Sequence, residues 1–204
     1  MDKWTRIPEE SIIKETVEAL KANGIESLIV ENGEKAKEKV LELIPEGSEV
    51  MTMTSMTLES IGIPTIINES GKYNSIRSKL NSLDRATQSL EMQKLGAAPE
   101  YVVGSVHAVT EDGKILIASF TGSQLPAYAY GSSHVIWVIG AQKIVKNFDE
   151  GLKRIYEHVL LLESERVKKI NMMPKSAVNK LLVINKEFKQ NRITLIIVKR
   201  VLGF

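Results

Sequence analysis

The fold is decided by residues 134–143, which read HVIWVIGAQK. The apolar run from Val135 to Ile139 is far too short to span a membrane, but it fits a central strand buried on both faces of a sheet. On both sides of this run, β-rich segments alternate with segments whose apolar residues recur at helical spacing. The alternation predicts an α/β fold, a three-layer sandwich with a mainly parallel sheet.

Working outward, Asn147 and Glu150 have the spacing of a capping box and predict a helix that runs to about residue 167. Residues 193–198 (ITLIIV) predict a further strand near the end of the sequence. Residues 1–45 predict a helix, a strand and a helix that belong to the same domain as residues 46–204, since no linker rich in Pro, Gly or Ser separates them.

Two β-rich runs, residues 101–109 and 114–120, flank the dipeptide Asp112-Gly113. This pattern predicts a hairpin with a type I′ turn, with Glu111 and Lys114 forming a charge pair across its tip. Between residues 46 and 100 the pattern is weaker. We expect residues 63–67 to be extended, because a proline biases the residue before it, and a helix over about 82–95.

The composition excludes several classes of protein. With no cysteine, the chain lacks disulfides, thiolate metal sites and a Cys nucleophile, and its three scattered histidines do not predict a metal site. A net charge of +2 does not indicate binding to nucleic acid or to membranes. The sequence starts without the apolar core of a signal peptide, so we expect a cytoplasmic protein.

Ligands of open α/β sheets bind beyond the carboxyl ends of parallel strands. Two loops in such positions carry hydroxyl groups or glycine, and one strand end carries a lysine, which together suit a small anion. Equally, Ser55 or Thr57 could simply cap a helix, and the loop at residues 121–124 could be a plain turn. Lys143 could simply lie on the surface. The candidate ligand-binding residues are Thr54, Ser55, Thr57, Thr121, Gly122, Ser123, Gln124 and Lys143.

For proton transfer, Glu111 and His134 are the candidate catalytic residues. The structural alternatives are a solvated hairpin tip for Glu111 and a half-buried structural role for His134.

Five segments resemble the lactate-utilisation (LUD) domain family, in particular its C-type group, and the resemblance covers most of residues 45–204. They are GSVHAVTEDG (104–113), GSQL (122–125), HVIWVIGAQKIV (134–145), RITLIIV (192–198) and LGF (202–204). The resemblance implies a fold similar to that of the ribose-phosphate isomerases, glucosamine-phosphate deaminases and CoA-transferases, with an anionic substrate at the strand ends.

The resemblance also implies a role in the oxidation of L-lactate or a similar small hydroxy acid. In that family the work is done by a complex whose other subunits carry iron–sulfur clusters, which this cysteine-free chain could not hold. The chain would then be a non-redox subunit or binding module. The alternative that the resemblance implies is a stand-alone enzyme, similar to CoA-transferases or sugar-phosphate isomerases, that acts on a small anionic metabolite such as a sugar phosphate, a CoA thioester or a folate. Homo-oligomerisation is left open.

Overall fold

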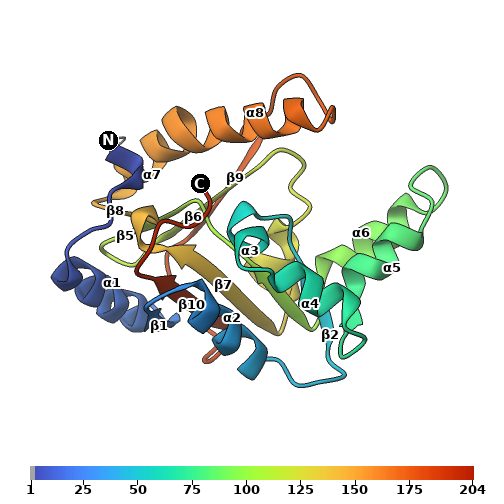
Figure 1. The fold of residues 1–204 in the computed structure, drawn as a ribbon, viewed down its shortest axis with the longest axis horizontal. Coiled ribbons are helices and arrows are strands. Elements are labelled where there is room, and N and C mark those ends of the chain that lie inside the picture. Colours follow the sequence, from blue (N-terminus) through green and yellow to red (C-terminus); the bar gives the residue numbers. More distant parts are fainter. Residues whose placement is uncertain (1–2) are drawn as a thin grey trace.

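The computed structural model describes residues 3–204 and contains two β-sheets (Figure 1). All strand pairs of the six-stranded sheet are parallel, and β7 lies in its interior between β10 and β4. In spatial order its strands are β1 (Glu26–Val30), β10 (Ile193–Val198), β7 (His134–Gly140), β4 (Tyr101–Gly104), β2 (Glu49–Thr52) and β3 (Asn74–Ser75). The predicted α/β class with a mainly parallel sheet is therefore confirmed.

The second sheet has four strands and is mostly antiparallel. In spatial order these are β8 (Ile144–Val145), β5 (Ala108–Thr110), β6 (Ile115–Ser119) and β9 (Lys180–Ile184). Short helical turns join the elements, namely η1 (Lys3–Thr5), η2 (Ala127–Gly131), η3 (Ala141–Lys143) and η4 (Ile155–Val159).

Alternate residues of β7 pack into two different apolar cores, which is why this strand is apolar throughout. Val135, Trp137 and Ile139 face α1 (Glu10–Ala22), α5 (Ile76–Ser82) and the second sheet. Ile136 and Val138 face the other side of the sheet. That side is covered by α2 (Gly33–Glu42), α3 (Met56–Ser60) and α4 (Ile63–Glu69).

The remaining helices lie outside these layers. The segment α7 (Phe148–Arg154) and the turn η4 pack along the second sheet through a smaller apolar cluster, and α8 (Leu160–Lys169) continues from η4 (Figure 1). The helix α6 (Ser89–Ala97) follows α5, and both extend away from the body of the molecule beside β2 (Figure 1).

The helix predicted after Asn147 is confirmed and begins with α7. The side-chain Oδ1 of Asn147 caps this helix by accepting a hydrogen bond from the Glu150 N–H at 3.0 Å. Two other predictions are wrong. Residues 63–69 form α4 rather than a strand, because Pro64 lies in the first turn, where its missing N–H costs nothing. The helix expected over 82–95 is interrupted, because Asp84 accepts bonds from Ala86 and Thr87 and holds a turn before α6.

The hairpin β5–β6 is confirmed, but its turn is not type I′. Gly113 has a φ of 81°, whereas Asp112 does not have the positive φ that a type I′ turn requires. The predicted Glu111–Lys114 pair is also wrong, because Lys114 pairs with Asp112. Among residues 3–204 we find no helix long and apolar enough to cross a bilayer.

Candidate functional site

A small polar pocket of about 290 Å³ lies where β2 ends, at the carboxyl edge of the six-stranded sheet. Its walls come from β2, the loop after it, α3, α4 and α5. The lining residues are Thr52, Met53, Thr54, Glu59, Pro64, Asn68, Arg77 and Asn81.

Arg77 provides the positive charge of this pocket. Its Nε and Nη2 atoms donate to the backbone oxygen of Thr52 at 3.1 and 2.6 Å, which fixes the plane of the guanidinium. A guanidinium has five N–H donors, so three are left for other partners. Burial lowers the pKa of Arg77, but a guanidinium remains protonated at neutral pH.

A hydrogen-bonded network forms the floor beside Arg77. The side-chain amide of Asn68 bonds to Thr52 Oγ1 at 3.0 Å and accepts from Ser75 Oγ at 2.8 Å. Ser75 also caps α5, the helix that carries Arg77, by accepting from the Ser78 N–H. These bonds hold β2, α4 and α5 together, so the pocket is organised without a ligand.

On the other side of α3, the side chain of Lys143 is buried, with 2% of the residue exposed. Its Nζ atom donates to Thr57 Oγ1 and Ser105 Oγ, both at 3.0 Å, and to the Val106 backbone oxygen at 3.1 Å. All three partners are uncharged. Burial, together with the nearby guanidinium of Arg154, holds the pKa of Lys143 well below its ordinary value.

Residues 200–203 pass across this edge of the sheet. The backbone oxygen of Leu202 accepts from Gln142 Nε2 at 2.9 Å, and Gly203 lies against Thr57. A Cβ atom on Gly203 would come within 2.3 Å of Thr57 Oγ1, and the φ of this glycine is +60°. A side chain would therefore not fit at position 203 without displacing the segment.

The side chains of the hydroxyl-rich loop at residues 54–57 have three different locations in the structure. Thr54 lines the pocket, Thr57 binds Lys143, and Ser55 caps α3 by accepting from the Leu58 N–H at 3.4 Å. The second predicted loop forms a turn whose bonds are largely internal. Ser119 Oγ donates to Gln124, Gly122 N donates to Ser119 Oγ, and Thr121 Oγ1 donates to Ser123.

The two predicted catalytic residues are not brought together. His134 begins β7 and stacks on Tyr101, with ring centroids 4.4 Å apart, at the amino edge of the sheet. Lys143 lies beyond the other end of that strand, roughly 20 Å away for seven residues at strand rise. Glu111 is half-buried in the hairpin, where its N–H donates to the Val145 backbone oxygen at 2.9 Å.

Sequence reasoning missed Arg77, Asn68 and Ser105. Arg77 and Asn68 fall in the segment with the weakest pattern, and Ser105 lies inside a β-rich run. A hydrogen-bonded network between segments far apart in the chain leaves no periodic signal in the sequence. Across residues 3–204, no cluster of three or more His, Asp or Glu side chains could hold a metal ion.

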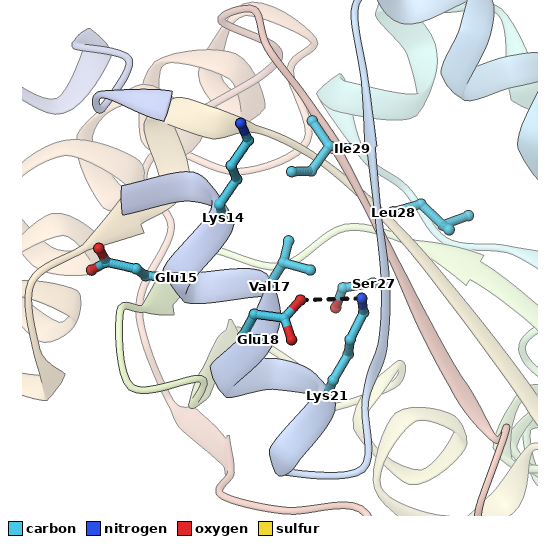
Figure 2. Close-up of a pocket in the computed structure, with 8 residues that line it drawn as sticks. All are labelled: Lys14, Glu15, Val17, Glu18, Lys21, Ser27, Leu28 and Ile29. Atoms are coloured by element: carbon cyan, nitrogen blue, oxygen red, sulfur yellow. Dashed lines mark hydrogen bonds and ion pairs between the residues drawn. The ribbon is translucent and has the colours of Figure 1, made fainter. Parts of the chain in front are cut away.

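A wider groove of about 650 Å³ lies between α1 and the edge strand β1 (Figure 2). It is lined by Lys14, Glu15, Val17, Glu18, Lys21, Ser27, Leu28 and Ile29. Its charged side chains are exposed, and Lys21 already pairs with Glu18 at 3.3 Å. It therefore lacks the half-buried, hydrogen-bonded guanidinium of the pocket around Arg77.

Comparison with solved structures supports the fold. The chain superposes on a DUF162 family protein from Deinococcus radiodurans with a TM-score of 0.58 at 10% sequence identity, covering 95% of this chain and 99% of that one. The chain also superposes on eIF2B beta from Chaetomium thermophilum with a TM-score of 0.38 at 12% sequence identity, covering 58% of this chain and 44% of that one. We draw no conclusion from this weak similarity. No curated protein matches the sequence. The family model of the LUD domain, however, matches residues 13–198, and the chain therefore belongs to the LUD domain family.

Proposed function

We propose that this protein binds a small hydroxy acid such as L-lactate in the pocket around Arg77, as a non-redox subunit or binding module of lactate utilisation in the cytoplasm. Membership of the LUD domain family relates the protein to lactate utilisation. The main support for the proposal is the guanidinium of Arg77, which lies in a polar pocket at the carboxyl edge of the sheet. Hydrogen bonds to Thr52 fix its plane and leave three N–H donors for a ligand.

The chemistry of the pocket suits such an acid at both of its polar groups. A guanidinium in a fixed plane binds a carboxylate with two parallel hydrogen bonds. The hydroxyl of a hydroxy acid needs an acceptor, and Glu59 or the side-chain oxygen of Asn81 can supply one. Glu59 would repel an anion that lacks a hydroxyl donor, so it favours hydroxy acids over plain carboxylates.

The volume also supports a small ligand. Drug-sized ligands occupy pockets of about 300–1,000 Å³, so a pocket near 290 Å³ suits a metabolite of a few non-hydrogen atoms. Because the chain has no cysteine, electrons from the acid would pass to another component. We propose iron–sulfur proteins as the partners, with no role for nucleic acid.

The test is a thermal-shift and calorimetric screen of L-lactate, D-lactate, pyruvate, a sugar phosphate, coenzyme A and a folate. A ligand at 100 times its Kd adds about 2.7 kcal/mol of stability, which is readily visible. We expect L-lactate or another hydroxy acid to bind, and Arg77→Gln to abolish the response. Arg85→Gln is the matched control, since Arg85 is exposed and lies in the turn before α6.

Two results would overturn the proposal. One is binding of hydroxy acids that is equal in the wild-type protein and Arg77→Gln. The other is binding and turnover of a sugar phosphate or coenzyme A thioester by the isolated chain, which would establish the stand-alone enzyme instead. Co-purification with cluster-bearing proteins tests the partner part of the proposal separately.

A further inference from the structure

Ser105 and Lys143 meet at the carboxyl edge of the sheet in a way that the binding role leaves unexplained. Ser105 directly follows β4, and its Oγ lies 3.0 Å from Lys143 Nζ. Ser105 is partly exposed, whereas Lys143 and Thr57 behind it are buried. A nucleophile at the surface with a base behind it is the arrangement of a serine–lysine pair.

The hydrogen bonds around Lys143 determine the direction of the Ser105 bond when the amine is neutral. A neutral amine has two N–H donors and one lone pair. The Val106 carbonyl oxygen can only accept, so it takes one N–H. Thr57 Oγ1 donates to the Leu202 oxygen at 3.4 Å, so toward Lys143 it accepts the second N–H. The lone pair of Nζ is then left for the hydroxyl of Ser105, because the other acceptors of that hydroxyl are more distant, Thr57 Oγ1 at 3.3 Å and the Val106 backbone oxygen at 3.5 Å.

The surroundings of Lys143 favour this neutral amine. Its three hydrogen-bond partners are uncharged, and the charged side chain that acts on it, Arg154, is another cation. Burial without a carboxylate disfavours the ammonium, which is how a lysine becomes a general base near neutral pH. His107, the nearest imidazole, instead accepts a hydrogen bond from the Ala118 N–H.

The position of Ser105 is set by its neighbours. A Cβ atom on Gly104 would lie 1.7 Å from the Tyr128 hydroxyl, so only glycine lets this buried tyrosine approach the strand end. The backbone N–H of Ser105 bonds to that same hydroxyl. The backbone is therefore anchored on one side of Ser105, and its side chain is anchored by Lys143 on the other.

We propose that Ser105 and Lys143 form a catalytic pair for acyl transfer from a small oxyester or thioester. In the first step, Ser105 Oγ forms a bond to the acyl carbon while its proton passes to Lys143 Nζ. The bond to the leaving group breaks, and the leaving alcohol or thiol takes that proton. Water then attacks the acyl-serine with Lys143 as base, releasing the carboxylic acid and regenerating Ser105. The step needs no oxidant, and it does not depend on lactate binding at Arg77.

The experiment uses the whole protein, a fluorophosphonate probe and p-nitrophenyl acetate. We expect one fluorophosphonate per chain, located at Ser105 by peptide mass spectrometry, and hydrolysis of the ester. Ser105→Ala should abolish labelling, and Lys143→Met should slow it by about 100-fold or more, the usual contribution of a general base. Ser89→Ala and Lys94→Met, exposed positions of α6, are the matched controls.

Because Lys143→Met could perturb folding, a second variant keeps the proposal testable. Ser105→Cys introduces a unique thiol, since the chain has no cysteine. A base 3.0 Å away should draw off its proton, so iodoacetamide should alkylate it at pH 7 at least about tenfold faster than the exposed thiol of Ser89→Cys. A lysine with only a structural role would not produce this difference.

The proposal is wrong if the wild-type protein takes up no fluorophosphonate, or takes it up at another residue. It is also wrong if Ser105→Cys reacts no faster than Ser89→Cys. Failure of lactate binding, by contrast, would leave these results unchanged and would count against the proposed function alone.

Discussion

His107 should make this protein sensitive to mild acid. Its Nδ1 accepts a hydrogen bond from the Ala118 N–H at 3.1 Å, which requires a neutral ring. Burial, with added repulsion from Lys143 and Arg154, lowers the pKa of His107 from 6.5 to about 3. The folded protein therefore keeps this ring neutral at pH values where the unfolded chain protonates it.

Proton linkage gives the direction and the size of the change in folding stability with pH. Between pH 6.5 and about 3 the unfolded state binds the additional proton, so stability falls as the pH falls through this window and is constant above it. From pH 7 to pH 5, these two pKa values give a loss of about 2 kcal/mol for this one group. Carboxylates with lowered pKa values, such as Asp84 and Asp112, lose their contribution only at lower pH.

The assay is urea denaturation at pH 7, 6 and 5, comparing the wild-type protein with His107→Asn. Asparagine offers a side-chain oxygen to the same N–H and does not titrate in this range. The variant should lose about 2 kcal/mol less than the wild-type protein between pH 7 and pH 5. Equal losses in the two proteins, or an NMR titration of His107 with a midpoint near 6.5, would refute the reasoning.

Two further predictions concern packing and buried charge. Gly104→Ala should destabilise the protein by about 1–3 kcal/mol, because the added methyl group collides with Tyr128. In the same thermal or urea unfolding series, Gly96→Ala should stabilise it by about 0.5–1 kcal/mol, since a Cβ on this glycine of α6 would meet no atom within 4 Å. An equal effect of the two changes would contradict the collision. Arg192→Leu should cost about 3–5 kcal/mol, because it removes the buried guanidinium that pairs with Glu187 and donates to the backbone oxygens of Ala127, Tyr128 and Ser132. An unfolding midpoint that stays near the wild-type value would show that water replaces these bonds.

Prediction from the sequence worked best where one physical requirement dominates. The run from Val135 to Ile139 is apolar at every position because both of its faces are buried, so strand β7 and the α/β class were readable. The cap at Asn147 was readable because capping depends on residues that are close in the chain. Pro64 was misread, because a proline fits both an extended segment and the first turn of a helix, and the packing of Ile63 and Ile67 decides between them.

The candidate site was only partly readable. The position of Lys143 after the most apolar strand marked it as a residue at the carboxyl edge, and the loop with Thr54 and Thr57 was marked in the same way. Whether His134 and Glu111 take part in catalysis stays a prediction. The separation of His134 from Lys143 depends on the direction of strand β7, which brings its first residue to the edge opposite Lys143.

The sequence by itself determined the α/β class, the central strand, the absence of thiol chemistry and the resemblance to the LUD family. These properties rest on composition and on patterns within a few residues. Only the tertiary structure decided that Arg77 faces the loop after β2, and that Ser105 lies 3.0 Å from Lys143. Those contacts join residues 25 and 38 positions apart in the chain, and no local pattern encodes them. They exist because parallel strands bring their carboxyl ends to one edge, where packing rather than sequence spacing sets the neighbours.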